Sequence, residues 1–276
     1  DNACGQLGVG DTALRANPSP MTTAGNPLTG ISKVTTSRGR TTYVQTNEGL
    51  RFAGAAIQGT RAECHDAAVL SPTFIDLGVN QKQVAGSNAA TLVLRSGGTV
   101  DSVGNDVFGE LGDGPGVSSG SGLRDSLFGS EVQQAQAGSE HFCAILDAGA
   151  SVSCVGNNSH RQVTGTFAGN ASEATPVTVA TTAAVDLMLA LGEQHSCVLS
   201  SNSGSNEVSC WGNNADGQCG TDPTQALLVN ASVVIASTDA TKIAAGAHHT
   251  CLLFPSGRVA CFGRNDFGQL GNGAQG

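Results

Sequence analysis

The stretch KIAAGAHHTCLLFPSGRVACFGRNDFGQLGNG, residues 242–273, decides the fold of this chain. It predicts a short strand, a second strand that starts near His249, a tight turn at 255–257 and a third strand through Cys261. A glycine-rich loop follows the third strand. The stretch therefore predicts a small antiparallel sheet that ends in a turn motif.

The same pattern recurs along the chain. The glycine after the closing strand is spaced by 50, 52, 56 and 51 residues, and the copies are Gly54, Gly104, Gly156, Gly212 and Gly263. The opening glycine aligns at Gly39, Gly86, Gly138, Gly192 and Gly246. The loop Gly-Gln-Leu-Gly at 268–271 is matched at 5–8, 109–112 and 217–220. A period of about fifty residues with three or four short strands per unit predicts an all-β propeller, in which neighbouring units bury each other's faces.

The repeated letters resemble a known family. They read Ala-Gly-x-x-His-[Ser/Thr]-Cys, a glycine turn, Val-x-Cys-[Trp/Phe/Val]-Gly-x-Asn and Gly-Gln-Leu-Gly, which is similar to the repeat of the regulator-of-chromosome-condensation (RCC) family. The resemblance covers nearly the whole chain and implies a β-propeller, usually of seven blades in that family, here as a secreted, disulfide-containing variant. Such propellers serve as GTPase exchange factors, a plant photoreceptor, a secreted enzyme inhibitor and adaptors, so the resemblance implies fold more than function.

The repeats define the domain organisation. We interpret 1–276 as a single propeller domain or a fragment of one. Its repeats fall at about 1–54, 55–104, 105–156, 157–212 and 213–263, with the start of a further repeat at 264–276. Residues 2–10 and 265–273 match the same part of the repeat. We therefore expect a section of a longer chain, or else a five-repeat unit that closes or polymerises, and favour the first.

Composition excludes several classes of partner. The net charge is −9, from 13 basic and 22 acidic residues, and a surface of that sign repels phosphate backbones. We expect no nucleic-acid binding. No run approaches the roughly 18 apolar residues that span a bilayer, so we expect no membrane insertion. Aromatic residues make up only 4% of the chain, which argues against a tryptophan-based photosensor and against sugar-binding platforms.

Six of the nine cysteines form pairs in the repeat. In three repeats they occupy the same two positions, and each pair is centred on a predicted hairpin turn. In the other two repeats both positions change, to Val44 with Phe52 and to Thr91 with Ser102. Facing residues of a hairpin lie close enough for a disulfide. We therefore predict three bonds, Cys143–Cys154, Cys197–Cys210 and Cys251–Cys261; the alternative is that these cysteines are reduced core residues.

The remaining cysteines are Cys4, Cys64 and Cys219. Their odd number leaves either one free thiol or one bond between chains. Disulfides persist in oxidising compartments, so the pairs predict an extracellular location or a secretory or periplasmic lumen. Three acceptor sequons, at Asn157, Asn170 and Asn230, fit a secreted eukaryotic glycoprotein, although an Asn- and Ser-rich chain also produces them by chance.

No pattern in the sequence points to catalysis. His141, His195 and His249 fall at one repeat position, and equivalent residues of different blades lie too far apart to share a metal ion. We interpret them as structural. The sequence contains no nucleophile elbow, no phosphate loop with a lysine and no His-Glu-x-x-His motif. We expect no catalytic residues, no cofactor and no metal, and therefore not an enzyme.

These observations favour an extracellular or lumenal protein-interaction module with an unidentified protein partner. The irregular loops at 55–66, 114–122 and 157–169 would supply the variable contacts on a rigid frame. One alternative is a guanine-nucleotide exchange factor for a small GTPase, which would need reduced cysteines and an intracellular location. Others are a secreted enzyme inhibitor and a self-associating subunit of an extracellular polymer.

Overall fold

The computed structural model of the chain describes most of residues 2–275. The ranges outside the description are 38–40, 47–48, 55–68, 76–80, 89, 113–119, 125–126, 130, 147–150, 165–170, 182–185, 203–204 and 226. Two of the predicted contact loops, 55–66 and most of 114–122, lie outside the described residues.

The described residues form five successive antiparallel sheets of three or four strands, in which each strand pairs with the next along the sequence. Sheet 1 contains β3 (Ile31–Thr36), β4 (Thr41–Thr46), β5 (Gly49–Gly54) and β6 (Val69–Ile75). Sheet 2 contains β7 (Gln81–Gly86), β8 (Ala90–Arg95), β9 (Val100–Gly104) and β10 (Gly120–Arg124). Sheet 3 contains β11 (Gln134–Ala137), β12 (His141–Leu146), β13 (Ser151–Asn157) and β14 (Ser172–Thr181). Sheet 4 contains β15 (Asp186–Leu191), β16 (His195–Asn202), β17 (Ser205–Asn213) and β18 (Leu227–Thr238). Sheet 5 contains β19 (Lys242–Ala245), β20 (His249–Leu253) and β21 (Val259–Gly263), and a small hairpin of β1 (Thr22–Thr23) and β2 (Asn26–Pro27) precedes sheet 1.

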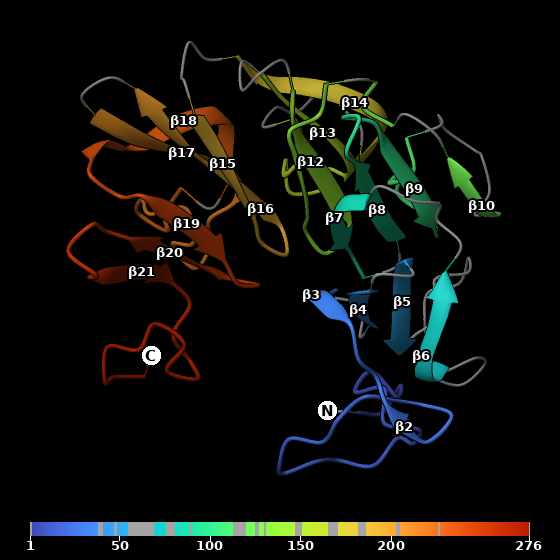
Figure 1. Cartoon of the computed structure of the whole chain (residues 1–276). Helices are drawn as coiled ribbons and strands as arrows, with labels where there is room; N and C mark the ends of the chain where they lie inside the picture. The colour runs from blue at the N-terminus through green and yellow to red at the C-terminus, as the bar shows by residue number, and fades with distance from the viewer. Residues whose placement is uncertain are drawn as a thin grey trace.

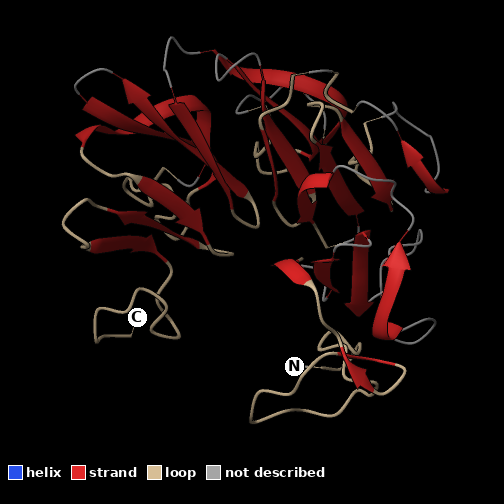
Figure 2. Cartoon of the chain, viewed as in Figure 1, coloured by secondary structure: helices blue, strands red, loops and turns tan. Residues whose placement is uncertain are grey.

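The five sheets fan out along an arc like the blades of a propeller (Figure 1). Both ends of the chain lie on the open side of the arc, the N-terminus near sheet 1 and the C-terminus beside sheet 5 (Figure 1). The described residues are strands, turns and loops, without a helix (Figure 2). The predicted all-β propeller of roughly fifty-residue repeats is confirmed. None of the described segments is a helix long and apolar enough to cross a bilayer.

The hydrophobic core lies between sheets rather than at one centre. Strand residues alternate between two faces, as in β20, where Thr250 and Leu252 are buried and their neighbours are partly exposed. Four clusters result, one at each junction between consecutive sheets. Each sheet therefore depends on its neighbours for burial of its apolar face.

Glycine turns close the hairpins between second and third strands. Gly98 and Gly257 each have a φ of 81°, a conformation that costs other residues energy. Their N–H groups donate to the carbonyls of Arg95 at 3.0 Å and Phe254 at 2.9 Å. The predicted turn at 255–257 is confirmed, whereas the turns on which the pairs Cys143–Cys154 and Cys197–Cys210 are centred, at 148–149 and 203–204, lie outside the described residues.

Candidate functional site

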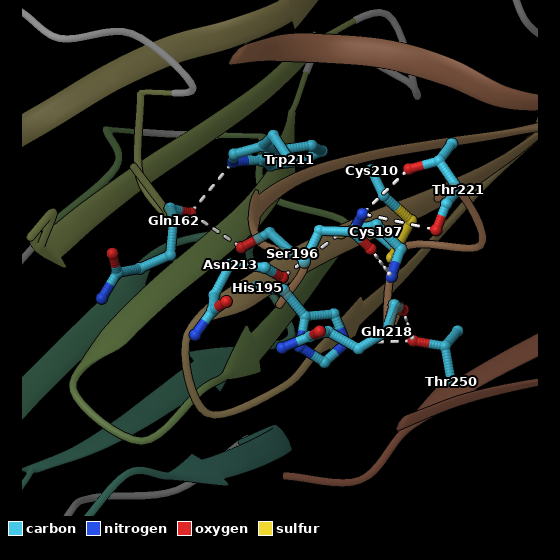
Figure 3. The surroundings of a disulfide bond; sticks show 12 residues. Gln162, His195, Ser196, Cys197, Cys210, Trp211, Asn213, Gln218, Thr221 and Thr250 are labelled. Carbon is cyan, nitrogen blue, oxygen red and sulfur yellow. Dashed lines mark hydrogen bonds between the residues drawn. A yellow bond between two sulfur atoms is a disulfide. The ribbon is translucent and has the colours of Figure 1, made fainter. Parts of the chain in front are cut away.

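A buried histidine joins sheets 4 and 5. Nε2 of His195 lies 3.0 Å from Oγ1 of Thr250, and this hydroxyl donates to the carbonyl of Gln218 at 2.9 Å. Because a hydroxyl has one proton and gives it to the carbonyl, His195 must be the donor through Nε2. His195 and Gln218 are both fully buried. Figure 3 shows them beside Thr250. The contact thus links β16 of sheet 4, the glycine-rich loop after that sheet, and β20 of sheet 5.

The same relay joins sheets 3 and 4. Nε2 of His141 lies 2.9 Å from Oγ of Ser196, which donates to the carbonyl of Gln162 at 2.8 Å. Nε1 of Trp211 donates to the same carbonyl at 2.9 Å, and the indole is fully buried (Figure 3). His141 and His195 thus make equivalent hydrogen bonds at two successive junctions between sheets.

The opening glycine of the repeat makes room for the histidine ring. A Cβ on Gly192 would lie 2.0 Å from Cε1 of His195, so any side chain there must displace the ring. In sheet 2, Ala90 holds the histidine position and Ser87 the glycine position. The N–H of Ser87 donates to the carbonyl of Ala90 at 2.8 Å, just as the N–H of Gly192 donates to the carbonyl of His195 at 2.8 Å. Oγ of Ser87 accepts the N–H of Ala90 at 3.0 Å. The opening position is therefore glycine where a histidine follows three residues later, and serine in sheet 2, where no histidine follows.

This pairing corrects the sequence alignment. Gly86 was aligned with the opening glycines, but it ends β7 and pairs with Thr91, one residue before the equivalent position at Ser87. Gly39 lies outside the described residues. The place equivalent to Gly192 in sheet 1 is held by Ser37, whose N–H donates to the carbonyl of Thr41 at 2.8 Å.

The three predicted disulfides are present. In each pair the cysteines face each other across the second and third strands with a Cα–Cα distance of 4.1 Å, and the pairs are Cys143–Cys154, Cys197–Cys210 and Cys251–Cys261. The first pair lies in the core between sheets 3 and 4, and the second in the core between sheets 4 and 5; all four of these cysteines are fully buried. The third pair is partly exposed on sheet 5.

The equivalent positions in sheets 1 and 2 differ from the sequence prediction by one residue. Phe52 faces Tyr43 rather than Val44, and Ser102 faces Leu92 rather than Thr91. Without cysteines to mark the register, the alignment had no residue that fixed it. Tyr43 and Leu92 hold the place of the first cysteine of the pair, and both are buried.

The remaining cysteines do not all fit the prediction of free or intermolecular thiols. Cys4 is fully buried and disulfide-bonded, and Cys64 lies outside the described residues. In the part of the chain that the structure describes, Cys219 is the one free cysteine. It is fully buried, and burial raises the pKa of its thiol to about 12. Cys219 is therefore a core residue and is poorly placed to bond to another chain.

The sequon at Asn157 is part of the fold. Its side chain is 7% exposed, Nδ2 donates to Oε2 of Glu140 at 2.8 Å, and Oδ1 accepts the N–H of Ser159 at 2.8 Å. A glycan on Nδ2 would replace the bond to Glu140, so glycosylation of Asn157 and this hydrogen bond exclude each other. Asn170 lies outside the described residues, and Asn230 lies in β18 with its side chain outside the description.

Two side-chain hydrogen bonds shape each glycine-rich loop. We call the loops by the preceding sheet: loop 2 (106–112), loop 3 (158–164), loop 4 (214–220) and loop 5 (265–271), with the matching N-terminal segment as loop 0 (2–8). In loop 4, Oδ1 of Asn214 accepts the N–H of Cys219 and Oε1 of Gln218 accepts the N–H of Asp216, both at 2.9 Å. The same two bonds close the other four, through Asn2 and Gln6, Asp106 and Glu110, Asn158 and Gln162, and Asn265 and Gln269.

The locked loops present variable side chains to solvent. The residue after the first Asn or Asp is exposed in all five, and these residues are Ala3, Val107, Ser159, Ala215 and Asp266. Val107 in loop 2 is 64% exposed, and Phe267, which follows Asp266 in loop 5, is 84% exposed. The repeat therefore fixes the backbone while leaving the outward side chain free to differ, which is the arrangement of a contact surface.

Sequence reasoning missed two further links between sheets. The hydroxyls of Tyr43 and Thr91 lie 2.6 Å apart and join sheets 1 and 2. Burial raises the pKa of Tyr43 to about 12. Between sheets 2 and 3, Nε2 of Gln83 donates to the carbonyl of Ala135 at 2.6 Å and Oε1 accepts its N–H at 3.3 Å. A glutamine recurs at the same repeat position as Gln134, a signal that was available in the sequence.

The described residues offer little for chemistry. His248 lies between two carboxylates, 3.1 Å from Glu193 and 3.3 Å from Asp216, on opposite ring nitrogens, so the three cannot share one ion. Nowhere in the described ranges do three or more His, Cys, Asp or Glu side chains gather to hold a metal. A central cavity of about 470 Å³ is lined by the innermost strands of all five sheets, and none of its lining residues is ionisable.

Comparison with known proteins agrees with this architecture. Residues 205–253 match a sequence profile described as Regulator of chromosome condensation (RCC1) repeat, and residues 240–269 match a second profile with the same description. No curated protein matches the chain in sequence.

Solved structures extend the likeness to the whole arc. Human WBSCR16 is similar with a TM-score of 0.71 and 18% identity, over 95% of this chain and 72% of that one. Prp20p from Saccharomyces cerevisiae gives 0.65 and 16%, over 88% of this chain and 60% of that one, so the chain spans about three-fifths of that protein. The ectodomain of the Physcomitrella patens receptor kinase CR4 gives 0.52 and 17%, over 85% and 52%. At these identities the likeness is one of fold. The chain is an RCC1-like β-propeller.

Proposed function

We propose that this chain is a protein-interaction module that acts in an oxidising compartment and has no enzymatic activity of its own. The observation that carries the proposal is the contrast within the loops, where paired side-chain bonds fix the backbone and the outward residues vary. Exposed apolar side chains such as Val107 and Phe267 are the kind of residue that anchors a protein contact.

Two observations support the finer parts of the proposal. The three disulfides favour an extracellular or lumenal location, because the cytosol keeps thiols reduced. Prp20p, whose fold is similar, binds Gsp1p and histones, so a propeller of this shape can serve as a protein-binding surface. The acidic charge of this chain argues against the nucleic-acid partners that chromatin binding would bring.

The test is affinity purification from the extracellular fluid of the source, followed by titration of any recovered partner. The loop variant Val107→Asp with Phe267→Asp should weaken binding about tenfold or more. The matched control is Val259→Asp, which changes an apolar residue that is 58% exposed on β21, away from the loops. A control that weakens binding equally would refute the loop surface. Accelerated nucleotide release from a small GTPase would favour an exchange factor instead.

The compartment is tested separately. Intact mass and peptide mapping of the native protein, alkylated with and without reduction, should show the three bonds closed. Free thiols at all six positions in protein taken directly from its source would refute the oxidising location, whatever partner is found.

A further inference from the structure

Loop 2 differs from its sister loops at one buried position. Four loops carry glutamine there, and loop 2 carries Glu110. Oε2 of Glu110 accepts the N–H of Phe108 at 2.9 Å, just as Oε1 of Gln218 accepts the N–H of Asp216 at 2.9 Å. The geometry of the lock is unchanged. The chemistry is not, because an amide is always neutral and a carboxyl group can ionise.

The surroundings of Glu110 are closed to water. Its residue is 2% exposed, and loop 2 sits directly against β14 of sheet 3. A Cβ on Gly109 would lie 2.5 Å from Cα of Ala174, and the adjacent Leu111 belongs to the core cluster between sheets 2 and 3. A charge on Glu110 would therefore be a buried charge at a junction between sheets, where ionisation is costly.

Among the described residues, the charges that act on Glu110 are acidic, and they belong to Asp106 and Glu140. Asp106 starts loop 2 and accepts the N–H of Leu111 through Oδ1 at 2.7 Å. Glu140 precedes β12, and on β14 Glu173 is next to Ala174. Burial is the main cause that raises the pKa of Glu110, to about 7. The backbone N–H groups of Phe108 and Glu110, which favour the ionised carboxylate, act against burial, and the charges of Asp106 and Glu140 act with it.

We propose that Glu110 makes the junction between sheets 2 and 3 a pH-sensitive joint. When protonated, the carboxyl group copies the glutamine amide and loop 2 is held as in the sister loops. When ionised, it gives its proton to solvent and becomes a buried anion among acidic neighbours, and loop 2 loosens from β14. The folded protein holds the proton more tightly than the unfolded chain does. The stability from this site is therefore complete below a pH of about 4.5 and is lost as pH rises through about 7.

The first test is Glu110→Gln, which restores the sister residue. Between pH 5 and pH 8, the melting temperature of the unaltered protein should fall more than that of the variant. At pH 8 the variant should melt higher by roughly 5 °C, while at pH 4.5 the two should agree. Hydrogen exchange, corrected for intrinsic rates, should place the difference at loop 2 and β14. Identical pH profiles for the two proteins would overturn the proposal.

The second test moves the joint elsewhere and does not depend on how Glu110→Gln folds. Gln218→Glu places a carboxyl group at the same position of loop 4, where the residue is fully buried. It should create a new loss of stability above about pH 6, localised to the junction of sheets 4 and 5. The matched control is Gln269→Glu in loop 5, where the equivalent residue is partly exposed and the loss should be much smaller. A Gln218→Glu protein as stable at pH 8 as at pH 5 would also overturn the proposal.

Discussion

Sheets 3 to 5 and sheets 1 to 2 share one geometry and are held together by different chemistry. In sheets 3 to 5, each second and third strand is joined by a disulfide. At the two junctions among these sheets, a buried histidine reaches a hydroxyl group on the next sheet. In sheets 1 and 2, the facing pairs are Tyr43 with Phe52 and Leu92 with Ser102. The repeat thus preserves the positions of strands and loops, while the residues that fix them can change.

The junctions show the same freedom. Tyr43 reaches Thr91 from a position two residues beyond that of the histidines and still meets the hydroxyl of the next sheet. Between sheets 2 and 3, Ala90 and Phe142 occupy the two relay positions and join an apolar core. A buried polar contact is stable only when each group has its partner, so loss of one member favours replacement of the whole set.

The disulfides provide the largest test of this contrast. Replacing Cys197 and Cys210 with alanine removes a bond that closes a 13-residue separation in a fully buried site, and should cost about 3 kcal/mol of unfolding free energy. Urea denaturation measures the loss. Hydrogen exchange should show the loss of stability in sheets 4 and 5, because this disulfide lies in the core between them.

The control is the same double replacement at Cys251 and Cys261. That pair closes a similar separation of 10 residues but is partly exposed, so its loss should be smaller because less packing is removed. Equal losses in all five sheets after the Cys197 and Cys210 replacement would show that the sheets are not stabilised separately.

The link between glycine and histidine gives a test of intermediate size. Gly192→Ser should cost about 2 kcal/mol, because the new Cβ meets the buried His195 ring. In a His195→Ala background the same change should cost little, since it copies Ser87 with Ala90, where the serine hydroxyl accepts a backbone N–H at 3.0 Å. A double-mutant cycle by urea denaturation measures the coupling. Equal costs in the two backgrounds would mean that the ring does not dictate the glycine.

The sequence predicted the repeat and the disulfides because both are written locally. Glycines at turns and cysteines symmetric about them lie within about a dozen residues of each other, so spacing alone fixes them. Prediction failed where register depended on distant contacts. Gly86 looks in the sequence like an opening glycine, yet Ser87 holds the opening position. Because Ala90 stands at the histidine position, no ring needs the space of a glycine, and a serine can bond to the backbone there instead.

The contacts between sheets could not be read in advance for a related reason. Tyr43 and Thr91 are 48 residues apart, and His195 and Thr250 are 55 apart, so no local pattern marks the partners. Only the constant phase of the repeat brings such residues together. The exposed side chains of the loops were likewise not predictable one by one, because the paired backbone bonds place no demand on them.

The smallest expected effect concerns Arg161, a residue in loop 3 that stands where loop 4 has a glycine. Loop 3 has Arg161 with a φ of 65° where loop 4 has Gly217 with 75°, and an L-residue in this conformation costs about 1 kcal/mol. Arg161→Gly should therefore give a protein about 1 kcal/mol more stable than Arg161→Ala, which removes the same side-chain contacts and keeps the backbone cost. Gly217→Ala should lower the free energy of unfolding by a similar amount. A Cβ there meets atoms only at 3.5 Å and beyond, so the backbone conformation alone causes the loss. Urea denaturation of the three variants decides the point. If Arg161→Gly and Arg161→Ala are equally stable, loop 3 is not strained, and the shared loop geometry is less demanding than the five identical pairs of hydrogen bonds imply.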